Sequence, residues 1–281
     1  MKRFIFQKLA LFLLVGTLIY LQGYHPKTVT TSGTEQKTKL AVIMYHGFTD
    51  THNESTYVIN AKKLEDDIIY LKNNGFSFVT PGDLTNFCDY GTPLPEKCVM
   101  LTFDDGYLNN YLYAYPIIKK HNTRVTISPI AYYTDYHTNH HDPNPAYAHM
   151  TWSQLKEMSD SGLCDIQNHS YNMHSLQNGR KGSARAVSET PKDYREAFLH
   201  DLFKAHSSVT QAIGKEPIAY AYPFGSISYE TRALLKCCGY RVSFSCEEGY
   251  NYITRHKDSL YMLKRFNRSN EKNVATILAD Y

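Results

Sequence analysis

Residues 99–106 read VMLTFDDG, five apolar or β-branched residues followed by two aspartates and a glycine. A short apolar run bounded by turn residues predicts a β-strand. Asp104 and Asp105 then lie at the carboxyl end of this strand, and Gly106 begins the turn that follows it. In a parallel sheet, the residues that end neighbouring strands lie close to this aspartate pair.

The same strand pattern recurs along the chain, at residues 40–44, 76–80, 124–130, 163–168, 218–222, 241–245 and 260–266. Helix signals lie between these segments: Asn60 caps a helix that ends at Gly75, Thr151 and Gln154 form a capping box, Thr190 and Pro191 open a long helix that ends at Gly214, and Gly239 ends another. Strands alternating with helices predict an α/β fold with a mostly parallel sheet. About eight such units predict a single-domain (β/α) barrel of seven or eight strands, with its active residues at the carboxyl ends of the strands.

The first 23 residues combine a basic start with an almost unbroken apolar run at residues 9–21. This layout predicts an export signal, so the folded part is expected to be extracellular or anchored on the outer face of the cytoplasmic membrane. Because no good small-residue cleavage site follows the run, residues 1–23 are expected to be either a signal peptide or an uncleaved membrane anchor. Residues 24–39 are rich in threonine and lysine and predict a flexible stalk, which leaves residues 40–281 for the barrel.

The composition describes a globular protein. Hydrophobic residues make up 42% and charged residues 20% of the 281 residues, which excludes a disordered, collagen-like or multi-span membrane chain. The formal net charge is +3, and all of that excess lies in the first 23 residues. The remainder is neutral overall, so we expect no nucleic-acid or polyanion partner.

Six cysteines in an exported chain could form disulfides, and the sequence does not choose among the pairings. Cys88 and Cys98 flank a turn-rich segment and are the most plausible pair. Cys237 and Cys238 are expected to be packed thiols. No C-x-x-C sequence occurs, which disfavours a zinc site built from cysteines.

The adjacent carboxylates of Asp104 and Asp105 repel each other at the strand end. They could be simple turn residues, or a cation could bind one of them and leave the other free as a base. A second predicted strand, 163–168, is followed by His169 and His174. Two imidazoles and one carboxylate with open positions predict a site for one divalent metal ion, with Zn²⁺ as the first choice and Co²⁺, Ni²⁺ or Fe²⁺ as alternatives.

A third predicted strand, 218–222, runs into Pro223, Phe224 and Gly225. These residues could be explained by turn geometry alone. In a barrel they form a loop at the same face as the metal site, where the backbone N–H of Phe224 could stabilise a developing oxyanion.

The motifs TFDDG (102–106), HSYNMH (169–174) and AYPFG (221–225) resemble, in this order, the first three motifs of the polysaccharide deacetylases of carbohydrate esterase family 4, the NodB homology domain. The resemblance covers roughly residues 40–268. It implies a distorted (β/α) barrel in which Asp104 is the catalytic base and Asp105, His169 and His174 bind the metal. The His spacing, VIMYHGF (42–48) and HMTW (149–152) are most similar to the adhesin-type poly-N-acetylglucosamine de-N-acetylases.

The chain departs from the family pattern at two places. Many members have an arginine, which orients the base, where this chain has Ala221, and the late Leu-x-x-His motif that supplies the general acid has no match. We expect Arg265, on the predicted strand 260–266, to replace that arginine, with Lys264 facing outward. His46, at the end of the first strand, is the candidate to assist proton transfer, although a packing role is also open.

Six tyrosines fall on predicted strand-end loops where their rings could stack on sugars: Tyr107, Tyr132, Tyr133, Tyr136, Tyr171 and Tyr222. Tyr107, Tyr171 and Tyr222 are the candidates for substrate binding. His137, His140 and His141 could form a second metal site, but exposed histidines in a loop are the favoured interpretation.

These patterns predict a metal-dependent hydrolase that removes N-acetyl groups from N-acetylglucosamine in an extracellular or cell-surface polysaccharide and releases acetate. The polysaccharide is then the expected partner, with the membrane as a second partner if the N-terminal segment is uncleaved. One alternative is an O-acetyl esterase acting on xylan-type polymers. Another is a sugar-binding surface protein that has lost its activity.

Overall fold

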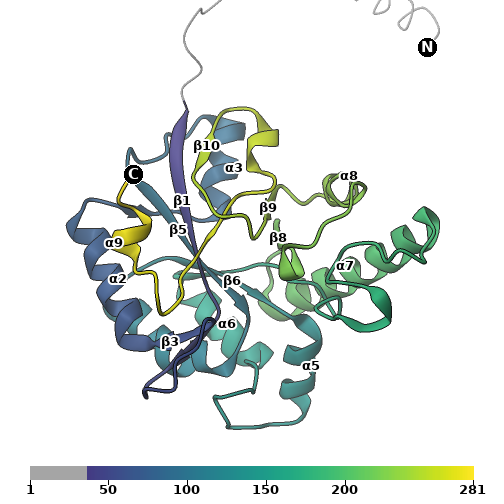
Figure 1. Cartoon of the computed structure of the whole chain (residues 1–281), viewed down its shortest axis with the longest axis horizontal. Coiled ribbons are helices and arrows are strands. Elements are labelled where there is room, and N and C mark those ends of the chain that lie inside the picture. Colours follow the sequence, from purple (N-terminus) through teal and green to yellow (C-terminus); the bar gives the residue numbers. More distant parts are fainter. Residues whose placement is uncertain (1–36) are drawn as a thin grey trace, which may run out of the picture. The chain divides into compact units, whose positions relative to one another are not determined.

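The computed structural model describes residues 37–281, shown as a coloured ribbon in Figure 1. The predicted signal or anchor at residues 1–23, and most of the predicted stalk, lie outside the described residues. Among residues 37–281, no helix is both long enough and apolar enough to cross a membrane.

The centre of the fold is a parallel sheet formed by β1 (Thr38–Tyr45), β5 (Cys98–Asp105), β6 (Val125–Pro129) and β7 (Cys164–Ile166). These strands follow the apolar runs of the sequence, and β5 is buried along its whole length. A strand buried on both faces is typical of a parallel sheet covered by other elements.

The sheet closes into a distorted barrel. β8 (Ala219–Ala221) and β9 (Val242–Phe244) pair with each other, and single bridges join Asn168 to Tyr220 and Phe244 to Leu263. β11 (Phe266–Asn267) then pairs in parallel with β1 and completes the ring. The prediction of a single-domain, distorted (β/α) barrel is confirmed. At two places in the ring, a single β-bridge is the only pairing between neighbouring segments of the described chain.

Four short strands lie outside this ring. β4 (Ser77–Phe78) pairs with the beginning of β5, β2 (Gly47–Thr49) pairs with β3 (Val58–Asn60), and β10 (Asn251–Ile253) pairs in antiparallel orientation with β1. The predicted strand 260–266 was only partly right. Its first residue ends a 3₁₀ turn (Lys257–Leu260), and Met262 has φ 63°, which interrupts an extended strand before Leu263.

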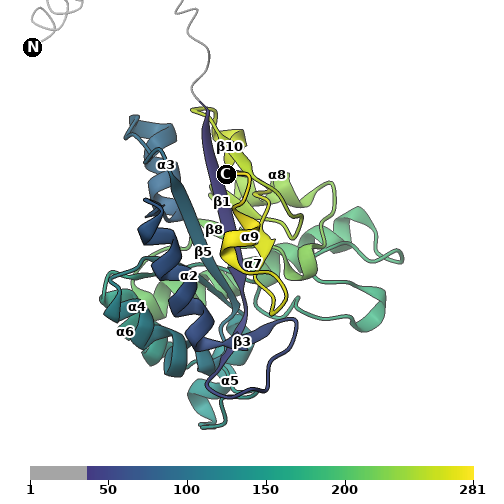
Figure 2. The same ribbon diagram turned by 60° about the vertical axis from the view of Figure 1, so that its left-hand side comes forward.

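Helices cover the outside of the ring: α2 (Ala61–Asn73), α3 (Pro81–Tyr90), α4 (Tyr115–Lys120), α5 (Ala131–Asn139), α6 (Trp152–Asp160), α7 (Pro191–Ile213), α8 (Thr231–Cys237) and α9 (Val274–Ile277). Figure 2 shows α2, α4 and α6 on one side of β1 and β5, with α7 and α8 on the other, and α9 packs against α2. The predicted capping signals are present, since the side chain of Asn60 accepts the Lys62 N–H and Thr151 forms its box with Gln154.

Alternation along the strands separates the two faces of the ring. On β1, Ala41 and Ile43 pack in the layer beneath the helices, whereas Leu40 and Val42 point into the barrel. The barrel interior is filled by apolar side chains from β1, β5, β8 and β9, which include Met100, Ala221 and Phe244. Apolar side chains therefore fill the barrel interior, and the inward-facing polar residues lie beyond them, at the carboxyl ends of the strands.

All six cysteines are free thiols, so the predicted Cys88–Cys98 disulfide is wrong. Cys98 begins β5 and its thiol lies 3.4 Å from the Lys39 carbonyl oxygen, whereas the Cys88 thiol on α3 lies 3.4 Å from the Thr254 carbonyl oxygen. Each side chain is thus held in a different contact. Cys237 is exposed, and so it is not the packed thiol that its position suggested.

Candidate active site

A pocket of about 860 Å³ opens at the carboxyl ends of the barrel strands. Nine of the residues singled out from the sequence line it: His46, Asp104, Asp105, Tyr107, Tyr133, His169, His174, Tyr222 and Phe224. The alternation that packs Leu40 and Val42 inside the barrel also brings His46 to this end, just as it brings Asp104 there on β5.

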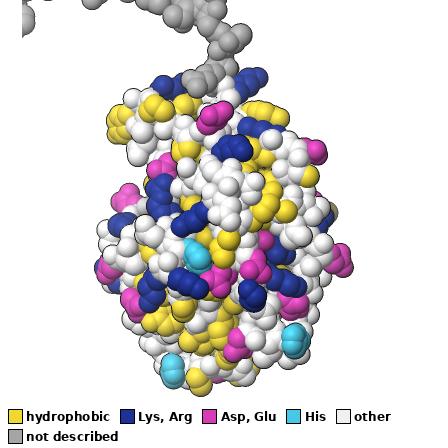
Figure 3. Space-filling view, turned by 90° about the vertical axis from the view of Figure 1, so that its left-hand side faces the viewer, with side chains coloured by type: hydrophobic (Ala, Val, Ile, Leu, Met, Phe, Trp, Pro, Cys, Tyr) yellow, Lys and Arg dark blue, Asp and Glu magenta, His cyan; other side chains and the backbone are white. Residues whose placement is uncertain are grey.

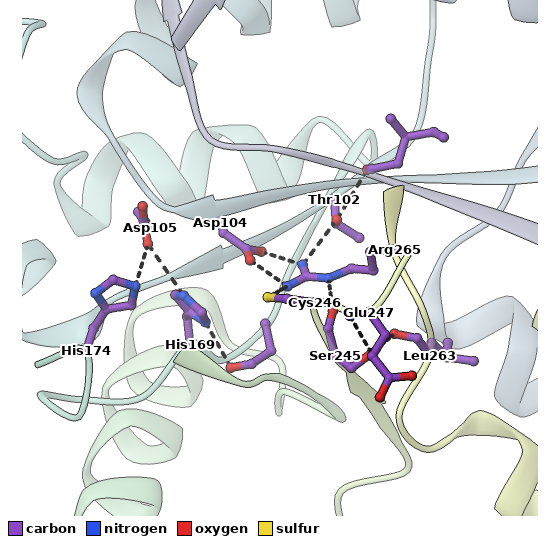
Figure 4. Close-up of polar contacts among 12 residues, drawn as sticks. Thr102, Asp104, Asp105, His169, His174, Ser245, Cys246, Glu247, Leu263 and Arg265 are labelled. Carbon is purple, nitrogen blue, oxygen red and sulfur yellow. Dashed lines mark hydrogen bonds and ion pairs between the residues drawn. The ribbon is translucent and has the colours of Figure 1, made fainter. Parts of the chain in front are cut away.

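The turn after β5 separates the two neighbouring carboxylates. Asp105 and Gly106 both have left-handed backbones, with φ 68° and 78°. A β-carbon on Gly106 would lie 2.8 Å from Cβ of Pro129, so this position requires glycine both for its conformation and for its contact with β6. As Figure 4 shows, the carboxylate of Asp105 turns toward the two histidines and that of Asp104 turns toward Arg265.

Asp105, His169 and His174 form a cluster with the geometry of a metal site. Oδ1 of Asp105 lies 3.4 Å from Nε2 of His169 and 3.5 Å from Nε2 of His174. Nδ1 of His169 donates a hydrogen bond of 2.8 Å to the Ala221 carbonyl oxygen, so in the neutral ring the lone pair of Nε2 faces Asp105. Oδ1 of Asp105 is buried and has no hydrogen-bond partner among the described residues. Two imidazole nitrogens and a free carboxylate oxygen fit one divalent ion.

The charges of this cluster are coupled. Burial would raise the pKa of Asp105, but the nearby histidines, His169 above all, hold it far below its ordinary value. Burial would lower the pKa of His169, but the carboxylates of Asp104 and Asp105 raise it. Burial lowers the pKa of His174 to about 4, so this ring is neutral and can serve as a ligand near pH 7.

Arg265 binds Asp104 through both arms of its guanidinium. Nη1 lies 2.9 Å from Oδ1 and Nη2 lies 2.8 Å from Oδ2, and Nε donates a 2.8 Å hydrogen bond to the Ser245 carbonyl oxygen (Figure 4). Arg265 is completely buried. Although burial alone would raise it, the Arg265 guanidinium holds the pKa of Asp104 below its ordinary value. The base candidate is therefore ionised and fixed in orientation.

The structure accounts for the alanine at position 221. Its side chain is fully buried in the apolar interior of the barrel, while its carbonyl oxygen orients His169. The cation beside Asp104 arrives instead from the segment that closes the ring, between the bridge at Leu263 and β11.

His46 and Phe224 lie on other sides of the pocket. Nδ1 of His46 is buried without a hydrogen-bond partner among the described residues, and burial lowers the pKa of this ring. Phe224 has φ 55°, and its ring centre lies 4.1 Å from that of His174. Its side chain is 38% exposed, which places it at the rim of the pocket.

The three tyrosines predicted to bind substrate lie in different positions relative to the pocket. Tyr107 lines the pocket next to the aspartates. Tyr222 is fully buried, so it has no free ring face to stack on a sugar. Tyr171 lies outside the pocket, where it packs against Tyr132 and beneath Lys204. The assignments of Tyr171 and Tyr222 are therefore corrected, because their rings are engaged by the protein.

Several lining residues were not named as site candidates from the sequence: Tyr57, Tyr147, His149, Cys246 and Glu248. Most come from loops whose path cannot be derived from periodicity. His149 offered the best signal, since it precedes the capping box of α6. The histidine group was also misread, because His137 is buried on α5 rather than exposed in a loop. Its ligand atoms form no second metal cluster within residues 37–281.

Residues 91–243 match the polysaccharide deacetylase family. The chain is 25% identical over 234 residues to a poly-β-1,6-N-acetyl-D-glucosamine N-deacetylase of Escherichia coli (strain K12), which covers 74% of this chain and 34% of that protein. An enzyme of the same name from Staphylococcus aureus (strain MRSA252) is 26% identical over 215 residues, covering 76% of this chain and 69% of the relative. The solved structure of a de-N-acetylase from Aggregatibacter actinomycetemcomitans superposes with a TM-score of 0.73 and 26% identity, over 86% of this chain and 99% of that one. The chain thus spans about a third of the length of the Escherichia coli relative.

Proposed function

This chain belongs to the polysaccharide deacetylase family, and we propose that it hydrolyses the N-acetyl groups of N-acetylglucosamine units in an extracellular or cell-surface polysaccharide and releases acetate. The observation that carries the proposal is the division between two adjacent carboxylates, with Asp105 in a histidine cluster and Asp104 on a buried arginine. The names of the relatives support N-acetylglucosamine as the substrate unit. The basic start and apolar run of residues 1–23 support action outside the cytoplasm.

Asp105, His169 and His174 would hold one divalent ion, and the donor set favours Zn²⁺ over harder ions. Such an ion supplies a Lewis acid, which makes water a better nucleophile near neutral pH and polarises an acyl oxygen. The Ala221 carbonyl holds the His169 ring in the tautomer that binding requires.

Asp104 acts as the general base. It takes a proton from the attacking water while the water oxygen forms a bond to the acetyl carbon. Arg265 keeps the carboxylate ionised and holds both of its oxygens, so its orientation does not change as it accepts the proton. The backbone N–H of Phe224 donates to the oxygen that gains negative charge.

The second half of the reaction breaks the bond between the acetyl carbon and the sugar nitrogen. That nitrogen needs a proton to leave as an amine, and the proton held by Asp104 is available for it. His46 lines the same pocket, and its Nδ1 is buried without a hydrogen-bond partner in the described part of the chain, so this ring relays the proton to the nitrogen. The products are acetate and a free amine on the sugar.

The test is acetate and amine release from β-1,6-linked N-acetylglucosamine oligomers, with and without a chelator. We expect wild-type activity to be lost with the chelator and restored by Zn²⁺. Asp104→Asn should retain the metal and lose about 10²- to 10⁴-fold in rate, the usual share of general base catalysis. His174→Ala should lose the metal, whereas the control His52→Ala, at an exposed position, should resemble wild type.

Three outcomes would contradict the proposal. Release of acetate from acetylated xylan without any amine product would indicate an O-acetyl esterase. Binding of the oligomers without acetate release under any metal condition would indicate a sugar-binding protein. Loss of the metal in Asp104→Asn would show that the roles of the two aspartates are reversed.

A further inference from the structure

His149 forms the wall of the catalytic pocket next to Tyr107, and the proposed reaction does not use its side chain. The backbone of this residue is tied to the aspartate turn, since Tyr107 and His149 form a β-bridge and the Met150 N–H donates to the Gly106 carbonyl oxygen at 2.8 Å. The side chain is only 7% exposed. His149 is therefore held at a fixed place beside the catalytic aspartates.

Aromatic rings fix the orientation of the His149 ring. Tyr133 stacks on it with ring centres 4.6 Å apart, and His137 lies parallel to it at 5.7 Å. The Tyr107 ring contacts it at 4.7 Å. A ring held in this way presents its nitrogens in a set direction.

Neither ring nitrogen of His149 makes a hydrogen bond of normal geometry with any residue between 37 and 281. Buried polar groups nearly always have a partner, because leaving one unpaired costs free energy. Burial lowers the pKa of His149 to about 4, against the opposing effect of the Asp105 carboxylate, so the ring is neutral near pH 7. A neutral imidazole has one donor and one acceptor to offer.

A second hollow of about 350 Å³ lies on the other side of this wall. It is lined by Tyr132, Tyr133, Tyr136, His137, Asp142, Tyr147 and His149. Tyr133, Tyr147 and His149 line both this hollow and the catalytic pocket, so the two spaces adjoin. Nδ1 of His137 is likewise buried without a partner within the described chain.

We propose that the two adjoining hollows hold neighbouring sugar units of one polysaccharide chain, and that His149 binds the substrate by hydrogen bonds between them. The proposal rests on the function proposed above. Neutral donors and acceptors match sugar hydroxyl and acetamido groups, which carry no charge. Tyr133, Tyr136 and Tyr147 are 37%, 49% and 56% exposed, so each ring keeps an exposed part that can contact the apolar face of a sugar.

The experiment compares the mono-, di- and trisaccharides of β-1,6-linked N-acetylglucosamine as substrates. Wild type should show a large rise in kcat/KM from monosaccharide to disaccharide, because the second unit fills the second hollow. His149→Phe keeps the aromatic stack but removes both nitrogens. In this variant the rise should be about tenfold smaller, mainly through a higher KM for the disaccharide, which corresponds to about 1.4 kcal/mol of lost hydrogen bonding.

Two further variants control for unfolding and for surface effects. His149→Asn keeps one donor and one acceptor, and it should retain part of the rise. His141→Phe makes the same change at an exposed histidine that lines neither hollow, and it should match wild type. Melting temperatures report whether each variant folds.

Calorimetric binding of the trisaccharide separates the two proposals. If wild type deacetylates the oligomers and His149→Phe shows the same rise and the same binding, the role of His149 is overturned and the function stands. If wild type binds but does not deacetylate, and His149→Phe binds more weakly, the subsite stands and the function fails. If wild type neither binds nor deacetylates, both fail.

Discussion

Asp104 and Asp105 are neighbours in sequence and have different electrostatic surroundings. A left-handed residue at the end of a strand sends one carboxylate to a pair of imidazoles and leaves the other facing into the barrel. The inward carboxylate is balanced by Arg265, which is itself fully buried. Neither carboxylate is paired with the other, so one can bind a metal while the other remains a base.

The pairing of Arg265 with Asp104 predicts that lysine cannot replace it. Arg265→Lys should lower kcat about 10- to 100-fold, because an ammonium group cannot hold both carboxylate oxygens in one plane. Arg265→Met should be more severe, since it leaves a buried carboxylate without a cation. Both variants should retain the metal, measured by elemental analysis. Arg241→Lys, in a partly exposed pair with Asp89 outside the pocket, is the control. Near-normal turnover of Arg265→Lys would remove Arg265 from the mechanism.

His149 predicts a defined pH dependence of stability. Burial lowers the pKa of His149 from 6.5 to about 4 in the folded chain. Between pH 6.5 and pH 4, the unfolded chain therefore binds a proton at this residue and the folded chain does not. The free energy of unfolding is therefore highest above pH 6.5, where His149 is neutral in both states, and it decreases as the pH falls toward 4. The free energy of unfolding of wild type, relative to His149→Phe, should decrease by about 3 kcal/mol from pH 7 to pH 4. Parallel curves from urea denaturation would show that His149 titrates normally.

Sequence reasoning brought together Asp104, Asp105, His169, His174 and Arg265, and the structure places these side chains in one site; their catalytic roles stay predictions. These residues were accessible because each follows a recognisable strand or a motif. Tyr171 lies outside the pocket and the Tyr222 ring is buried within its wall. These positions could not be predicted, because the sequence shows that a tyrosine ends a strand and not what covers its ring. His149 was missed as a site residue because its position depends on a long loop.

At the scale of the elements, the turn that follows β5 positions the metal ligand Asp105. Gly106 packs against Pro129 so closely that no side chain fits. Gly75, after α2, has a similar φ of 77°, but a β-carbon added there would have no neighbour within 4 Å among residues 37–281. The two glycines therefore share one conformational requirement and differ in packing.

Gly106→Ala should be much more harmful than Gly75→Ala. Both substitutions place a β-carbon in a left-handed backbone, which costs roughly 1–2 kcal/mol. Gly106→Ala adds a clash of about 1–3 kcal/mol and displaces Asp105, so metal affinity should fall as well. Denaturation and metal titration of both variants check this. Equal losses of stability with intact metal binding would show that the contact with Pro129 is not tight.

Elements with strong local signals were predicted closely, and those that depend on distant contacts were not. The long helix α7 begins at Pro191 and ends before Gly214 as its capping residues indicate. β10 could not be predicted, because its three residues become a strand only by pairing with β1. Likewise, the left-handed Met262 that interrupts the segment 260–266 has no sequence signal such as glycine or asparagine.

At the scale of the whole molecule, a second buried arginine holds the ring closed. Arg268 follows β11, and its Nε lies 2.6 Å from Oδ2 of Asp67 on α2, while the Tyr45 hydroxyl donates to the same oxygen at 3.1 Å. The backbone N–H of Arg268 also donates a hydrogen bond to the Met44 carbonyl oxygen on β1. By contrast, the surface in Figure 3 shows basic and acidic side chains interspersed, a pattern in which single pairs contribute little.

Asp67→Asn should therefore destabilise the protein by about 3–5 kcal/mol, because it leaves the buried Arg268 without its counter-charge. Its neighbour gives a matched control, since Asp66 pairs with Lys62 at the exposed surface of the same helix. Asp66→Asn should change the free energy of unfolding by no more than about 0.5 kcal/mol. Urea denaturation of both variants measures the difference, and similar small values would mean that the buried pair is dispensable.

The closure of the ring also sets the order in which the site can assemble during folding. Asp105, His169 and His174 follow β5 and β7 within one continuous half of the chain, whereas Arg265 is 161 residues away from Asp104. Contacts between distant residues form late, because the chain must first lose the entropy of a long loop. A partly folded chain can thus bring the three metal ligands together while Asp104 still lacks its cation. We therefore expect the return of the closing segment to β1 to come late in folding and to be the step that completes the base.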